Sequence, residues 1–141
     1  MLVMWLATIF LVILIAQIHY EALRGISFVM GKWRPRSRSH LTPMMIAIIF
    51  THLIEIAVFA VGFYFVAEGV GHGTLEGELG GGYLDYLYHS AVSYTSLGLG
   101  DVFPTGHMRL LTGVEALTGL LMIAWSASFT YLEMDKTWNR P

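Results

Sequence analysis

Residues 94–101, with the sequence YTSLGLGD, are the stretch that decides the fold of this chain. They place hydroxyl residues, two glycines two positions apart and an acid in one short loop between long apolar segments. Glycine tolerates positive φ, so its alternation with other residues lets successive backbone carbonyls turn toward one axis. Rings of such carbonyls, supplied by several copies of a loop, replace the hydration shell of a cation. The stretch therefore indicates a loop that coordinates cations with backbone oxygens.

The composition indicates that the surroundings of this loop are a lipid bilayer. Of the 141 residues, 55% are hydrophobic and 13% charged, and the mean hydropathy is +0.61. A soluble domain of this size rarely carries so few charges. The absence of cysteine excludes disulfides, thiolate metal sites and cysteine nucleophiles. We expect an integral membrane protein without an appended soluble domain.

Three apolar runs predict transmembrane helices, at residues 1–30, 43–67 and 107–132. The first run has no positive charge before its apolar core, which argues against a cleaved signal peptide. Residues 83–95 are too short to cross the bilayer together with the loop that follows, so we expect a re-entrant helix there. Irregular backbone at membrane depth, such as residues 96–101, is tolerated only where protein or a water-filled cavity surrounds it.

The distribution of charge predicts the orientation of the helices. The loop at residues 31–42 holds four Lys or Arg and no acid, whereas the loop at residues 68–82 holds three Glu and no base. Basic loops stay in the cytoplasm. We therefore expect the N-terminus outside, the loop at 68–82 outside, and a cytoplasmic tail at residues 133–141.

Residues 83–131 resemble the pore module of potassium channels, in the order pore helix, filter, proline turn and inner helix. The segments that carry the resemblance are YHSAVSYT at 88–95, SLGLGD at 96–101, VFP at 102–104, EALTGL at 115–120 and AWSA at 124–127.

The likeness is to small prokaryotic potassium channels with two helices per pore. It extends over a pore module at residues 43–132 and leaves the first helix as an addition. It implies an all-α membrane fold with three transmembrane helices, a re-entrant pore helix and a filter loop, assembled with four-fold symmetry as a homotetramer.

The resemblance also implies roles for individual residues. The backbone carbonyls that would bind K⁺ belong to Ser96, Leu97, Gly98, Leu99 and Gly100. The residues that would support the filter are Thr95, Asp101, Tyr88 and His89, the last two as hydrogen-bond donors to Asp101. Gly119 would correspond to a gating hinge in the inner helix. The alternative for Gly119 is close helix packing, which small residues favour in membranes.

The filter sequence departs from the commonest one at three positions. Ser96, Leu97 and Leu99 stand where Thr, Val and Tyr are usual, and Leu99 has no hydroxyl to bond the scaffold behind the filter. Val92 stands where some potassium channels carry an acid. These departures leave a weakly selective cation channel of the same architecture as an alternative.

Ionisable residues inside the spans form a second group of candidates, because such residues are functional hypotheses by default. His52 and Glu55 lie three apart on one helix face, and Glu115 lies in the third span. We favour a hydrogen-bonded packing cluster over a proton- or ion-sensitive element. A metal or redox protein that uses these three residues and His19 as ligands is an alternative from another class.

The sequence as a whole predicts a passive, potassium-selective channel in the inner membrane of a prokaryote. We expect a homotetramer in the lipid bilayer, no enzymatic activity or catalytic residue, no cofactor apart from the permeant K⁺, and no nucleic-acid partner. A non-conducting accessory subunit that retains the pore fold is a further alternative.

Overall fold

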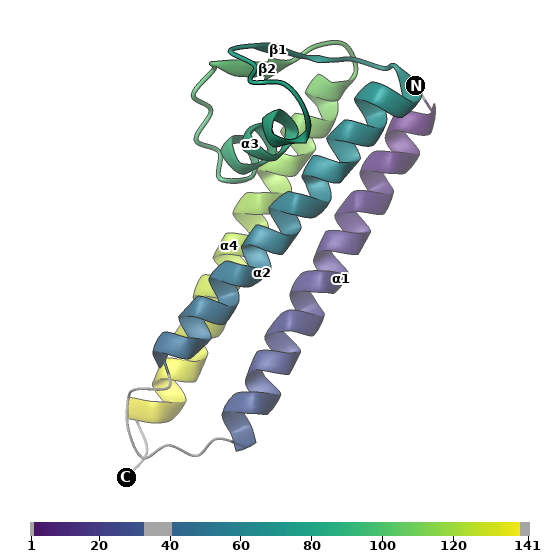
Figure 1. The fold of residues 1–141 in the computed structure, drawn as a ribbon. Helices are drawn as coiled ribbons and strands as arrows, with labels where there is room; N and C mark the ends of the chain where they lie inside the picture. The colour runs from purple at the N-terminus through teal and green to yellow at the C-terminus, as the bar shows by residue number, and fades with distance from the viewer. Residues whose placement is uncertain (1, 33–40, 139–141) are drawn as a thin grey trace.

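Three long helices lie side by side in the computed structural model, which describes residues 2–32 and 41–138 (Figure 1). They are α1 (Leu2–Lys32), α2 (Leu41–Tyr64) and α4 (Met108–Trp138). Each is long and apolar enough to cross a bilayer. The apolar residues are distributed around the helices, so many large hydrophobic side chains remain on the outside of the bundle. Such faces suit contact with lipid or with other membrane helices.

The second span is longer than the outer helix expected at residues 43–67. Helix α2 starts at Leu41 and continues past Tyr64 into a π-helical segment, η2 (Phe65–Val70). Gly71 ends this segment with φ of 67°, a left-handed conformation that glycine adopts without a Cβ penalty. The continuous span therefore runs over Leu41–Val70.

The short helix α3 (Tyr83–Tyr94) packs between α2 and α4 at one end of the bundle (Figure 1). Its 12 residues extend only about 18 Å, which is too short to cross a bilayer. The Asp85 carboxylate accepts hydrogen bonds from the backbone N–H of Gly80 at 3.0 Å and of Gly81 at 2.7 Å. These bonds hold the preceding glycine-rich turn against the start of the helix.

Two short strands, β1 (Leu75–Gly77) and β2 (Val102–Pro104), join the loops on either side of α3. They pair antiparallel, with Leu75 opposite Pro104 and Gly77 opposite Val102. A Cβ at Gly77 would lie 1.9 Å from the backbone oxygen of Asp101, and its φ is 115°. Only glycine fits there, so the two loops approach more closely than any other residue would allow. These strands were not predicted from the sequence.

The hydrophobic core lies where all the helices meet near α3. Buried side chains from α1, α2 and α4 include Ile15, Phe59, Phe63, Met108 and Leu111. A smaller cluster of Leu23, Met44 and Ile48 joins α1 to α2 toward their connecting loop. The expected fold class, a helical membrane protein with three spans and a short re-entrant helix, is confirmed.

Two expected boundaries differ from those in the structure. Helix α4 does not end at residue 132, since it continues to Trp138 and includes most of the expected tail. In this extension Lys136 donates to Glu133 at 2.6 Å, one helical turn away. Helix α1 likewise reaches Lys32 and α2 starts at Leu41, so both enter the expected loop at 31–42. Residues 33–40 and 139–141 lie outside the described residues.

Candidate ion-conducting site

The loop after α3 folds back onto the C-terminal end of that helix. The backbone N–H of Ser96 donates to Ser93 at 2.9 Å, and those of Leu97 and Gly98 donate to Val92 at 3.0 and 3.4 Å. In a planar trans peptide the carbonyl points opposite to the N–H of the next residue. The carbonyls of Thr95, Ser96 and Leu97 therefore point away from the helix.

Positive φ angles recur at every second residue of this loop. They are 56° at Ser96, 58° at Gly98 and 82° at Gly100. The two glycines adopt this conformation freely, whereas a residue with a Cβ carries a strain of about 1–2 kcal/mol. The alternation indicated by the sequence is thus present in the backbone, and it extends one step further to Ser96.

The loop is exposed on the single chain, although its residues are largely apolar. Leu97 is 62% exposed and Leu99 is 59% exposed, and residues 95–100 are all classed as exposed. The tyrosine, serine and valine residues immediately before the loop are buried. The end of α3 is thus buried, whereas the loop that follows it is exposed. The carbonyls and the two leucines of this loop are available for contacts outside the chain.

Asp101 is held at the end of the loop by three backbone and side-chain contacts. Tyr88 donates its hydroxyl to Asp101 Oδ2 at 2.5 Å, and the Val102 N–H donates to Oδ1 at 3.0 Å. The Glu78 N–H donates to the Asp101 carbonyl at 2.9 Å. The bond from Tyr88 keeps the pKa of Asp101 below its ordinary value. Asp101 therefore carries a negative charge at neutral pH, and Tyr88 is the donor that the sequence analysis expected.

His89 does not take the role expected for it. Its Nε2 lies 3.0 Å from the Thr112 hydroxyl on α4 and 3.4 Å from the Ser93 hydroxyl. Its other hydrogen bond is with the backbone of Val102, not with the Asp101 carboxylate. Its ring meets Phe63 of α2 edge-on, with 4.9 Å between centroids. The expectation failed because adjacent residues on a helix point about 100° apart, so Tyr88 and His89 cannot both face the loop. His89 instead connects α3 to the two spanning helices.

Thr95 and Gly119 shape the end of α3 from two sides. The Thr95 hydroxyl donates to the Ala91 carbonyl at 2.7 Å and so caps the last turn. A Cβ at Gly119 would lie 2.0 Å from the Tyr94 carbonyl oxygen. Helix α4 therefore contacts the end of the pore helix directly at Gly119. This contact gives the packing interpretation of Gly119 a concrete basis.

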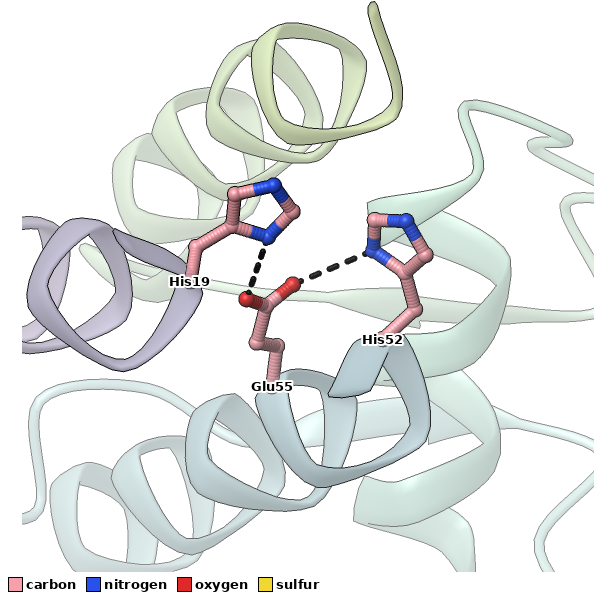
Figure 2. A group of neighbouring side chains, drawn as sticks. All are labelled: His19, His52 and Glu55. Atoms are coloured by element: carbon pink, nitrogen blue, oxygen red, sulfur yellow. Dashed lines mark hydrogen bonds and ion pairs between the residues drawn. The ribbon is translucent and has the colours of Figure 1, made fainter. Parts of the chain in front are cut away.

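A buried polar cluster lies behind the end of α3, among all the helices. Figure 2 shows Glu55 of α2 between His19 of α1 and His52 of α2. Glu55 Oε1 lies 2.9 Å from His19 Nδ1, and Oε2 lies 3.1 Å from His52 Nδ1. Tyr94 donates its hydroxyl to Glu55. Glu55 and His19 have no exposed surface, so these contacts replace water for both side chains.

The cluster differs in membership from the one expected at His52, Glu55 and Glu115. The spacing of His52 and Glu55 predicted their contact, but His19 reaches them from a different helix. Glu115 instead contacts Ser90 of α3 at 2.5 Å, and its Oε2 is buried without a hydrogen-bond partner among the described residues. The sequence offered no signal that would rank His19 above Glu115, because their contacts depend on how the helices pack.

Together, the spanning helices, the re-entrant helix and its carbonyl loop define a pore-loop membrane protein. The chain matches the family described as ion channel, Ion_trans_2, over residues 51–132, which is more than half of the chain. The chain therefore belongs to this family of two-helix pore-loop channel domains. Helix α1 lies outside the matched residues. Searches of curated proteins and of solved structures gave no match.

Proposed function

We propose that this chain is the subunit of a potassium-selective channel that conducts K⁺ passively through a homotetrameric filter. The observation that carries the proposal is the loop at residues 96–100. Its hydrogen bonds to α3 direct backbone carbonyls away from the chain, and its alternating φ values suit a line of oxygens. Successive carbonyl rings of this kind take the place of water around a permeating cation.

The exposure of the loop supports a four-fold assembly. One chain supplies one strand of carbonyls, whereas a cation in a filter is coordinated from all sides. The exposed leucines at positions 97 and 99 would lose contact with water when neighbouring copies cover them. Burial of apolar side chains is favourable by about 25 cal/mol per Å². The same contact would thus complete the cation site and stabilise the assembly.

The direction of α3 adds an electrostatic contribution to conduction. The helix ends at Tyr94, immediately before the loop. A helix C-terminus carries the equivalent of roughly half a negative charge from its unpaired carbonyls. Four such ends around one axis would favour a cation on the inner side of the filter, where a bare ion in the bilayer is otherwise costly.

The side chain at position 99 favours a second candidate, a weakly selective cation channel. Leu99 has no polar group to fix the filter from behind. A filter with fewer restraints adapts more readily to Na⁺ as well as K⁺. The two candidates share every feature of the fold, so only permeation distinguishes them.

The proposed location is the inner membrane of a prokaryote, with the N-terminus outside and the C-terminus in the cytoplasm. The support is the basic stretch at residues 31–42 and the acidic loop at 68–82, which lie at opposite ends of α2. The filter loop would then lie toward the outer side. A cysteine placed in each loop and labelled from outside the cell would test this orientation.

Ion flux from the purified protein in liposomes tests the proposal. We expect a K⁺ gradient to drive a flux well above that driven by an equal Na⁺ gradient. Equal fluxes would overturn potassium selectivity and favour the general cation channel. No flux of either ion from an intact tetramer would favour the non-conducting accessory subunit instead.

A further inference from the structure

The cluster around Glu55 has a donor arrangement that the conduction proposal does not use. His19, His52 and Glu55 each offer one ligand atom, and these atoms lie within 4.8 Å of one another. Figure 2 shows both imidazoles turned toward the carboxylate that lies between them. The residues come from α1 and α2, and all three ligand atoms belong to side chains, unlike the backbone carbonyls of the filter loop.

The outer nitrogens of the two histidines share one hydroxyl as hydrogen-bond partner. His52 Nε2 lies 3.2 Å and His19 Nε2 3.4 Å from the Ser126 hydroxyl on α4. A hydroxyl has one hydrogen but two lone pairs, so Ser126 accepts from both N–H groups but donates to only one ring. When both Nε2 atoms carry hydrogen, both Nδ1 lone pairs point at the Glu55 carboxylate. The Tyr94 hydroxyl, 2.9 Å from His52 Nδ1, has one hydrogen for either that ring or Glu55, whereas a cation placed among the three side chains would accept the lone pairs of all of them.

The surrounding hydroxyls match the second shell of a metal centre. A metal-ligating histidine almost always donates its other ring N–H to a neighbouring acceptor, and a ligating carboxylate is hydrogen-bonded in turn. Ser126 fulfils the first condition for both histidines. Tyr94 fulfils the second by donating to Glu55. Both conditions are met by residues of α3 and α4, which supply no ligand themselves.

We propose that His19, His52 and Glu55 form a site for a divalent transition-metal ion, with Zn²⁺ as the ion that fits the donors best. Two imidazoles and a carboxylate are a zinc donor set, with bonds of about 2.0–2.2 Å. A tetrahedral centre with such bonds separates its ligand atoms by about 3.4 Å. The two imidazole nitrogens lie 2.9 and 3.1 Å from different oxygens of the Glu55 carboxylate. One ligand atom from each residue lies within 4.8 Å of the others, so side-chain shifts of about 1 Å would bring all three to one ion. His52 retains 17% side-chain exposure and provides the approach.

The site joins the added helix to the pore module. Helix α1 lies outside the residues matched by the channel family, and His19 is its only ligand in the cluster. Tyr94, which bonds Glu55, is the last residue of α3 before the filter loop. A metal ion would therefore fix α1 to α2 at a position one hydrogen bond from the base of the filter.

Metal content and a spectroscopic probe test the site without reference to conduction. The full-length protein, stripped with chelator and incubated with Zn²⁺, is expected to retain about one ion per chain after desalting. Substitution with Co²⁺ is expected to give the intense visible absorption of a tetrahedral centre. Chelator-treated protein should gain several degrees of thermal stability when Zn²⁺ is returned, because the ion binds only the folded state.

Matched variants distinguish this site from other histidines. His19→Gln and Glu55→Gln should lower Zn²⁺ retention at least tenfold, and Ser126→Ala should weaken affinity by about 10–100-fold through the second shell. The control is the double variant His72→Asn/His107→Asn, which removes the other close histidine pair, with ring centroids 5.7 Å apart. It should retain the ion.

The wild-type measurement remains decisive even where a variant fails to fold. No retained Zn²⁺, no Co²⁺ absorption and no Zn²⁺-dependent stabilisation of the wild-type protein would overturn the proposal. Hydrogen bonds alone would then hold the two histidines against Glu55. Loss of the ion in the His72/His107 control would overturn it as well. Neither result depends on flux, so these measurements test the metal site independently of the proposed conduction.

Discussion

The filter loop and the Glu55 cluster hold their polar groups in opposite ways. The loop at residues 95–100 is exposed, is built from backbone atoms, and is anchored by bonds to residues no more than six positions away. The cluster is buried, is built from side chains, and joins residues as distant as His19 and Ser126. The comparison separates two tasks. The proposed cation coordination depends on local backbone geometry, whereas attachment of the added helix depends on long-range side-chain contacts.

The largest expected effect comes from removing the backbone freedom of the loop. Gly98→Ala should abolish K⁺ flux in liposomes while leaving the assembly intact, because a Cβ disfavours the φ of 58° and turns a carbonyl away. No atom lies within 4 Å of a Cβ at Gly98, so the effect is conformational and not a clash.

The matched control for this change is Gly113→Ala. Gly113 lies within α4 and also has nothing within 4 Å of an added Cβ, but alanine favours its helical conformation. Normal flux through Gly98→Ala would show that residues 96–100 are not the conducting loop. Loss of flux in Gly113→Ala alone would point to α4 instead.

The next largest effect is expected at Gly119, where α4 contacts the end of α3. Gly119→Ala should destabilise the protein by about 1–3 kcal/mol, because overpacking against a backbone atom forces the helices apart. The added Cβ would meet the Tyr94 carbonyl oxygen at 2.0 Å. Thermal unfolding in detergent, compared with Gly113→Ala, measures the difference. Equal stability of the two variants would contradict the packing role of Gly119.

An effect of comparable size is expected from the hydroxyl that connects the cluster to the end of α3. Tyr94→Phe removes the donor to Glu55 and its contact with His52 at 2.9 Å. Loss of a hydrogen bond to a charged group costs about 1.5–3 kcal/mol. The loss should appear as a lower thermal midpoint with the assembly state unchanged. An unchanged midpoint would show that the cluster does not hold the end of α3.

The smallest effect is expected at the outer end of the loop and is seen only in acid. Tyr88→Phe removes the donor that keeps the pKa of Asp101 below its ordinary value of 3.8. A carboxyl with a depressed pKa stays charged until the pH falls through that lower value. In the variant, Asp101 should take up its proton at a higher pH.

K⁺ flux measured against external pH, from about 3 to 6, checks this shift. The acid side of the flux profile should move to higher pH in Tyr88→Phe and remain where it is in a variant such as Tyr83→Phe. Identical profiles for wild type and Tyr88→Phe would mean that Asp101 ionisation does not affect conduction.

Several features of the pore module could be predicted from local sequence. The alternation of glycine at 98 and 100 indicated the positive φ angles, and the length of residues 83–95 indicated a helix that does not cross. Tyr88 was recognised as the donor to Asp101. These features depend on residues within one or two turns of each other, where backbone sterics and helix periodicity act directly.

Other features escaped local inference. The pairing of β1 with β2 depends on the close contact of Gly77 with Asp101, two residues that the whole of α3 separates in the sequence. His89 was assigned to Asp101, but the packing of α2 and α4 places it against Phe63 and Thr112. The continuation of α4 to Trp138 passes through a polar stretch that sequence reasoning treated as a tail.

The sequence by itself determined that this chain is a membrane protein with a pore loop, because hydrophobic run length and the glycine pattern act within single segments. Only the tertiary structure decided that His19 meets Glu55 while Glu115 turns to Ser90. The physical reason is the rotation of each helix about its own axis. That rotation is set by the packing of all neighbouring helices at once, and no single segment encodes it.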